Sequence, residues 1–271
     1  MNSLVPRVNA SAEANGLKIS DNTFKIELFK DAKFEFFKKE IVQKITQNIL
    51  ITAEDRDKIC EDLFLRLRGI IEEKFDQIKS DIGTKKIIGE SLNCLASSDK
   101  SNYKEKVSLL EGLLAEKLKN IEDEKTHYLV MEAIDAIKML TRDELRYLSI
   151  IVFITAYSAA KKVSRVELKD YLNKICLPND FTKTLEYGNH ILQRLSKCGL
   201  IMKGGVSGIR NSAHDNKLKE WFSCDDENSL EDAVNETGYD KKLILIVRNV
   251  NEVTYLGEYL GQKVLKNLGV I

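Results

Sequence analysis

The feature that most constrains this chain is a long uncharged segment, YLSIIVFITAYSAA, at residues 147–160. Arg146 and Lys161 close its two ends, and no charged side chain lies between them. A helix that crosses a bilayer needs about 20 apolar residues, so this segment is too short to span a membrane. A helix that is apolar on every side belongs instead in the interior of a protein. We therefore expect residues 147–160 to form a helix at the centre of the fold.

A capping box marks where that helix begins. Thr141 is followed three residues later by Glu144. Thr and Glu at this spacing satisfy two of the free N–H groups at a helix start. The Ile, Val and Tyr residues of the segment favour a strand when taken alone, but the cap and the length of the pattern favour a helix.

Apolar residues recur every three or four positions before this segment, as they do on one buried face of a helix. The chain also contains only two prolines, so few helices are interrupted. The first stripe comprises Phe34, Phe37, Ile41, Ile45 and Ile49; the second opens at Thr52 and comprises Ile59, Leu63, Leu67, Ile70, Ile71, Phe75 and Ile78. We expect Gly83 to end the second region, and further helices over about 85–95, 107–118 and 127–140, with a loop at 97–102 between the first two.

The stretch LQRLSKCGLIMKGG at residues 192–205 is typical of the end of a winged-helix domain. A helix ends at Gly199, a short apolar strand follows, and a glycine pair makes a turn before a return strand near Ile209. A further strand is expected in KKLILIVRNV, residues 241–250. Asn249 with Glu252 is expected to cap a last helix that buries Val253, Leu256, Leu260 and Val264. On that helix Gly257 and Gly261 would allow close approach of a neighbouring backbone.

These patterns predict a mainly α chain. We expect a polar N-terminal segment with a short strand over residues 1–30, a helical bundle over 31–162, and a winged-helix-like domain with a few short strands over 163–271.

Two stretches resemble an uncharacterised bacterial family of mostly helical proteins. They are IIGESLNCLASSDKSNYKEKVSLLEGLLAEKL, residues 87–118, and KMLTRDELRYLSIIVFI, residues 138–154. LSKCGLI followed by TYLGEYLG is similar to the tail of the Abi-alpha group, abortive-infection-like proteins often placed in phage-defence contexts. The chain departs from the family pattern where Ile82, instead of proline, follows Asp81. The resemblance implies a fold and a bacterial origin, and it implies no catalytic residue.

No constellation of catalytic or metal-binding residues is recognisable. The three histidines, His127, His190 and His214, are scattered, and the five cysteines include no CxxC pair. No glycine-rich phosphate-binding motif is present. We therefore expect a cytoplasmic protein that is not an enzyme, with reduced thiols, no metal and no cofactor.

One region has the charge that nucleic-acid binding requires. Residues 182–219 contain seven basic and two acidic side chains, although Lys plus Arg equals Asp plus Glu, 42 each, over the whole chain. The expected DNA contacts are Lys183, Arg194, Lys197, Lys203 and Arg210. Residues 220–240 then hold eight acidic and no basic side chains, which would repel a duplex or cover the basic helix.

The function expected from these observations is that of a non-enzymatic bacterial interaction or scaffold component, in a phage-defence system, acting through self-association or a protein partner. A DNA-binding winged-helix regulator is the first alternative. An effector that perturbs membranes by releasing residues 147–160 is the second.

Overall fold

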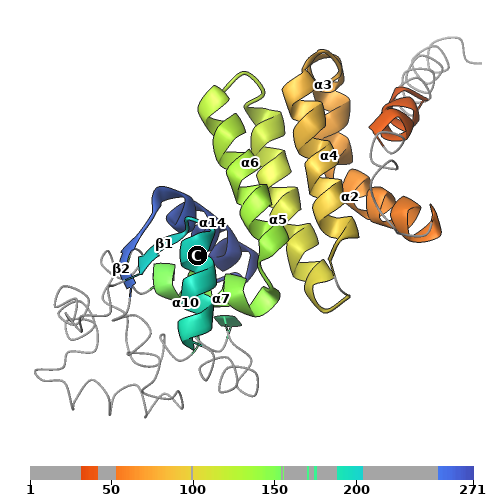
Figure 1. The fold of residues 1–271 in the computed structure, drawn as a ribbon. Helices are drawn as coiled ribbons and strands as arrows, with labels where there is room; N and C mark the ends of the chain where they lie inside the picture. The colour runs from red at the N-terminus through yellow and green to blue at the C-terminus, as the bar shows by residue number, and fades with distance from the viewer. Residues whose placement is uncertain are drawn as a thin grey trace, which may run out of the picture.

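The computed structural model describes residues 32–41, 53–98, 100–153, 155, 170, 174–175, 188–203 and 250–271. Helices dominate this part of the chain, which confirms the expectation of a mainly α fold (Figure 1). After an unlabelled helix at residues 32–41 come α2 (Ala53–Glu73), α3 (Phe75–Ser80), α4 (Ile82–Ala96), α5 (Lys100–Lys119), α6 (Glu124–Met139), α7 (Arg142–Val152), α10 (Gly188–Lys197) and α14 (Tyr255–Asn267), with strands β1 (Ile201–Lys203) and β2 (Val250–Val253).

The helix at residues 32–41 packs on α2 through aromatic side chains. Its predicted stripe is confirmed where it is described, because Phe34, Phe37 and Ile41 are buried. Phe34 and Phe37 lie edge-on to Phe64 of α2, with ring centroids 6.0 and 6.2 Å away. The end of this stripe, at Ile45 and Ile49, lies outside the described residues.

The second predicted stripe is buried at Leu63, Leu67, Ile71 and Ile78, and its other members, Ile59, Ile70 and Phe75, are partly buried against the same core. The helix that carries it is divided, however, because Lys74 adopts φ −104° and ψ 14° between α2 and α3.

The expectation that Gly83 ends this region is wrong. The carboxylate of Asp81 accepts hydrogen bonds from the N–H groups of Gly83 and Thr84, at 3.1 and 3.0 Å, and thereby caps the start of α4. Gly83 therefore lies in the first turn of α4. A Cβ atom there would lie 2.7 Å from Cε1 of His127 in α6, so the glycine is needed for close helix packing.

α4, α5 and α6 lie side by side, joined by short connections (Figure 1). The three helices predicted at about 85–95, 107–118 and 127–140 are thereby confirmed. α5 begins earlier than expected, because residues 100–102 are helical and not part of the loop predicted at 97–102.

α7 is the buried helix that the uncharged segment predicts, as far as the structure describes it. Every residue from 147 to 153 is buried. The predicted capping box is present, with Thr141 at the N-cap and Glu144 three residues on. Residues 154 and 156–160 lie outside the described part. Release of this segment into a membrane would require exposing the part of the core that residues 147–153 occupy.

The described C-terminal elements follow the predicted order of helix, turn and strand. α10 leads through Gly199, which has φ 71°, into β1. β1 pairs with β2 in an antiparallel, two-stranded sheet in which Met202 lies opposite Glu252. The expected return strand near Ile209 and most of residues 241–250 lie outside the described residues, so the winged-helix arrangement stays a prediction.

The expected cap of the last helix is wrong. The strand β2 continues through Val253, and the side chain of Thr254 accepts a hydrogen bond from the N–H of Gly257, at 3.1 Å. Thr254 and not Asn249 is therefore the N-cap of α14. The strand continues because β2 pairs with β1, a tertiary contact that outweighs the capping pattern at Asn249 and Glu252.

α14 packs closely on α7 and on the start of β1. A Cβ atom at Gly257 would lie 1.9 Å from the carbonyl oxygen of Leu200, and one at Gly261 would lie 2.4 Å from a methyl group of Val152. The predicted close approach is confirmed at Gly257, where the neighbour is backbone; at Gly261 the neighbour is a side chain. Because α14 also contacts α5 and α6, the described C-terminal residues share one core with the bundle.

Candidate functional site

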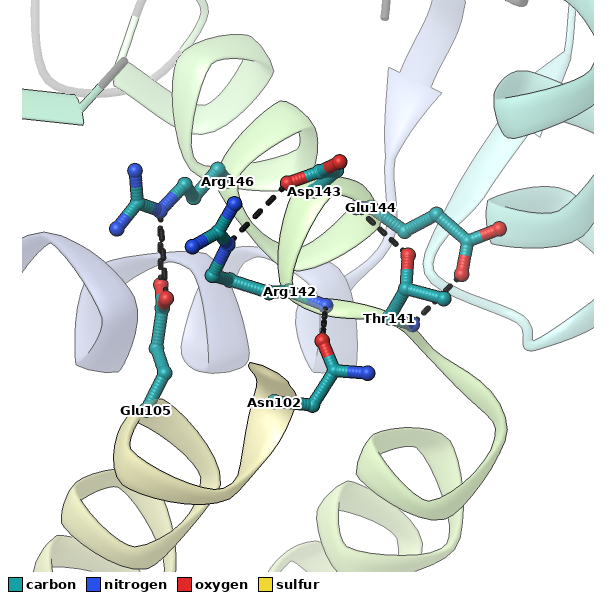
Figure 2. Close-up of polar contacts among 7 residues, drawn as sticks. All are labelled: Asn102, Glu105, Thr141, Arg142, Asp143, Glu144 and Arg146. Atoms are coloured by element: carbon teal, nitrogen blue, oxygen red, sulfur yellow. Dashed lines mark hydrogen bonds and ion pairs between the residues drawn. The ribbon is translucent and has the colours of Figure 1, made fainter. Parts of the chain in front are cut away.

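Polar side chains of α5 and α7 meet at the N-terminus of α7 (Figure 2), and Arg194 of α10 joins them through Glu144. The hydroxyl oxygen of Thr141 accepts from the N–H of Glu144 at 3.3 Å, and the N–H of Thr141 donates to Oε2 of Glu144 at 2.8 Å. These reciprocal bonds satisfy two N–H groups that the helix geometry leaves free. One carboxylate oxygen of Glu144 is thereby used to start α7.

The other carboxylate oxygen of Glu144 binds α10. Nε of Arg194 lies 2.6 Å from Oε1 of Glu144, and the Arg194 guanidinium also donates to the carbonyl oxygen of Met139 at the end of α6. The Glu144 side chain is only 7% exposed, whereas that of Arg194 is 39% exposed. Arg194 therefore holds α10 against the corner between α6 and α7.

The α5 side of the same cluster supplies Asn102 and Glu105. Oδ1 of Asn102 accepts from the N–H of Arg142 at 2.7 Å, and the Glu105 carboxylate accepts from Nε of Arg146 at 3.2 and 3.3 Å. Burial raises the pKa of Glu105, and the attraction of Arg146 only partly opposes that rise. We call Asn102, Glu105, Thr141, Arg142, Glu144, Arg146 and Arg194 the polar junction.

The polar junction can hold α5, α7 and α10 together. Its carboxylates are each engaged by a guanidinium, and its hydroxyl group is the cap of a helix. These contacts use charge-assisted hydrogen bonds, which are the stronger class. The arrangement is therefore that of a structural tie.

A second tie joins α5 to α14. The hydroxyl of Tyr259 donates to Oε2 of Glu116 at 3.0 Å, and Nζ of Lys263 binds the same oxygen. The Lys263 ammonium also lies over the Tyr259 ring, 5.3 Å from its centroid. Burial and the Glu116 charge raise the pKa of Tyr259.

The described histidines and Cys94 take no part in these clusters, whereas Cys198 lies near Arg194 and Glu144. His127 packs between Gly83 and the Tyr128 ring, His190 is exposed on α10, and His214 lies outside the described residues. Burial raises the pKa of the Cys94 thiol to about 11 and also raises that of Cys198. Within the described ranges no group of three or more His, Cys, Asp or Glu side chains could hold a metal ion.

The residues predicted to contact DNA differ in their surroundings. Arg194 is paired with Glu144, and Lys197 is exposed at the end of α10. Lys203 is the last residue of β1, while Lys183 and Arg210 lie outside the described residues. The pairing of Arg194 weighs against its binding a phosphate group, since a phosphate would have to displace a nearly buried carboxylate.

Several large apolar side chains lie at the surface of the described part. The most exposed are Ile82 at 81%, Tyr255 at 77% and Tyr128 at 68%. Ile82 and Tyr128 stand at the starts of α4 and α6, which are the helices that Gly83 and His127 bring into contact. The sequence patterns indicated the capping box of the polar junction, but neither this surface nor the contacts of the junction with α5 and α10, because those depend on contacts between separate helices.

The model of an uncharacterised protein family matches residues 34–268 of the chain. No curated protein and no solved structure matches the chain. Among the described helices, none is both long enough and apolar enough to cross a membrane.

Proposed function

The chain belongs to the uncharacterised family whose model matches residues 34–268, and on that premise we propose that it is a non-enzymatic interaction component. It acts through self-association or through a protein partner. The observation that carries this proposal is the exposure of Ile82 and Tyr128 on neighbouring helices of an otherwise well-packed core. Exposed apolar side chains that lie together on a protein surface are typical of interaction sites.

The pairing of acidic side chains between helices supports the same proposal. Glu105, Glu144 and Glu116 are the buried or half-buried acids of the helix junctions, and each is bound to a cation or a hydroxyl of another helix. Such pairing fixes the relative positions of helices. A rigid arrangement of helices suits a scaffold that presents a fixed surface to a partner.

We place this activity in the cytoplasm of a bacterium and in a phage-defence setting. The support is the similarity of LSKCGLI and TYLGEYLG to the tail of the Abi-alpha group. In the described residues these two motifs form the end of α10 with β1 and the start of α14, which pack together through Leu200 and Gly257. A winged-helix-like arrangement of residues 163–271 remains part of this proposal.

The test is the oligomeric state of the purified full chain. Light scattering over a range of protein concentrations is expected to give a mass above that of one chain, or a stoichiometric partner is expected to copurify. A chain that stays monomeric throughout and copurifies with no partner would overturn the proposal.

DNA binding is a second candidate because α10 has a polar outer face. His190, Gln193 and Lys197 are exposed, whereas Leu192 and Leu195 are buried. A duplex is then expected to bind with an affinity that falls steeply with salt, and Lys197→Ala is expected to flatten that dependence. Unchanged mobility of a duplex at low salt would exclude this function.

A further inference from the structure

We propose that the outer face of α4 and α6 binds the same face of a second copy of this chain. We define this outer face by Ile82 and Lys86 on α4 and by Glu124, Tyr128, Glu132 and Met139 on α6. The inference rests on the proposed function, because it identifies the surface through which the chain self-associates and the twofold symmetry that relates the two copies.

The first step is that α4 and α6 run parallel. Gly83, near the start of α4, faces His127, near the start of α6. Farther along both helices, the carboxylate of Glu90 lies 2.5 Å from Nζ of Lys138. The two contacts come in the same order along both helices, so the helices point in the same direction.

The second step is that the named side chains point to one side of this pair. Successive residues of a helix are rotated by about 100°. Ile82 comes one residue before Gly83, and Tyr128 comes one residue after His127. Because Gly83 and His127 face each other, these opposite steps turn Ile82 and Tyr128 to the same side. The buried residues of both helices, such as Ile88 and Ile134, lie on the other side.

The third step is that this side is open and partly apolar. Ile82 is 81% exposed, Tyr128 is 68% exposed and Met139 is 52% exposed. A Cβ atom at Gly89, which lies on the same side of α4, would meet nothing within 4 Å. The apolar side chains therefore extend along the face, and the described part of the chain leaves them uncovered.

The fourth step is that the charges of the face are separated by helix. Lys86 lies one turn beyond Ile82 on α4, while Glu124 and Glu132 lie one turn to either side of Tyr128 on α6. All three are exposed. Among the described residues, none of them has an ion-pair partner. The face thus carries an unpaired positive charge on one helix and unpaired negative charges on its neighbour.

These charges fit a second copy in one arrangement. A twofold axis in the plane of the interface and parallel to the helices places α4 of each copy over α6 of the other. Ile82 then meets Tyr128 of the second copy, and Lys86 meets Glu132 of the second copy. A twofold axis perpendicular to the helices would place α4 over α4 and bring like charges together. The charge pattern therefore selects the first arrangement.

The test measures the dissociation constant of the full chain by sedimentation velocity. Tyr128→Asp, Lys86→Glu and Glu132→Lys are each expected to weaken self-association by about tenfold or more, because each places a charge on an apolar contact or opposes like charges. The double variant Lys86→Glu with Glu132→Lys restores the pairing and is expected to return the constant to near the wild-type value. Leu65→Asp, at an exposed apolar residue of α2, is the matched control and should change nothing.

A second measurement does not depend on these charges. Ile82→Cys and Tyr128→Cys chains are mixed and treated with a short bismaleimide, with each variant alone and the wild type as controls. The mixture is expected to give far more cross-linked dimer than any control. Circular dichroism confirms that each variant is folded.

The outcomes separate the two proposals. If the wild type self-associates but neither the charge reversals nor Tyr128→Asp weaken it, the outer face is not the interface and the proposed function stands. If the wild type is monomeric but copurifies with a partner, this inference is overturned and the proposed function again stands. If it is monomeric without a partner, both fall.

Discussion

At the scale of single residues, Glu144 holds two elements with one carboxylate. Oε2 accepts from the N–H of Thr141 and Oε1 binds Arg194, while the side chain is almost fully buried. Glu144→Ala removes half of the capping box and leaves Arg194 without its carboxylate partner. We expect a loss of about 3 kcal/mol in the free energy of unfolding, measured by urea denaturation.

Asp143→Ala is the matched control for this prediction. Asp143 is the neighbouring acid, it is half exposed, and its contact is a surface pair with Arg142 at 3.3 Å. The expected loss is below about 1 kcal/mol. Equal losses for Glu144 and Asp143 would mean that the contact with Arg194 contributes no stability.

Asp81 makes the stability depend on acid pH. Burial alone would raise the pKa of Asp81, but the hydrogen bonds from Thr84 and Gly83 outweigh burial and lower the pKa below its usual value. A carboxylate with a lowered pKa contributes stability that is complete above its unfolded pKa and is lost as the pH falls through the folded value. Asp81→Asn is therefore expected to reduce the loss of melting temperature between pH 5 and pH 2. Asp76→Asn, at an exposed carboxylate of α3, should not reduce it.

Ile82 occupies the first helical position of α4, where proline is favoured. Asp81 before it has φ −89° and ψ 105°, an extended conformation that a following proline accepts. Ile82→Pro is therefore expected to raise the free energy of unfolding by about 0.5 kcal/mol, measured on dilute protein to limit self-association. Lys86→Pro, one turn later, should lower it by about 3 kcal/mol. A large loss at Ile82 would contradict the position assigned to the helix start.

At the scale of elements, helix existence could be read from the sequence and some helix ends could not. The stripes at Phe34 and Leu63 and the capping box at Thr141 depend on neighbours within a turn, and local spacing records these. The start of α4 was expected at residue 85 because Gly83 resembles a helix end, whereas the carboxylate of Asp81 caps the helix two residues before that glycine. The start of α14 depends on a tertiary contact instead, because the pairing of β2 with β1 continues past Asn249.

The packing of α14 depends on its two glycines. A Cβ atom at Gly257 would overlap the carbonyl oxygen of Leu200, which is backbone and cannot move aside alone. Gly257→Ala is therefore expected to lower the free energy of unfolding by about 2 kcal/mol or more, through displacement of α14. Gly112→Ala is the matched control, since a Cβ atom in that part of α5 meets nothing within 4 Å. It should raise the stability by about 0.5–1 kcal/mol, because alanine favours the helix. A neutral Gly257→Ala in the same thermal and urea series would contradict the close contact.

At the scale of the whole molecule, the sequence predicted the core better than the contacts between elements. The uncharged segment identified α7 as the centre without any knowledge of its neighbours. The ties Glu144 to Arg194 and Glu116 to Lys263 join residues 50 and 147 positions apart, and neither has a local pattern. The same holds for the outer face of α4 and α6, whose residues share a surface only because two helices run parallel. For this reason the candidate DNA residue Arg194 could be identified as basic but not as already paired.

The shared core leads to a last prediction about how the chain unfolds. A boundary near residue 162 would suggest two units that unfold separately, but α14 packs on α7, α5 and α6. Leu260 is fully buried on α14. Leu260→Ala is expected to cost about 2–5 kcal/mol. Because the core is common to both parts, we expect this loss to appear equally in the slowest-exchanging amides of α6 and of α14, measured by native-state hydrogen exchange. If α14 alone lost protection while α6 kept it, the two parts would unfold as separate units and the common core would not be cooperative.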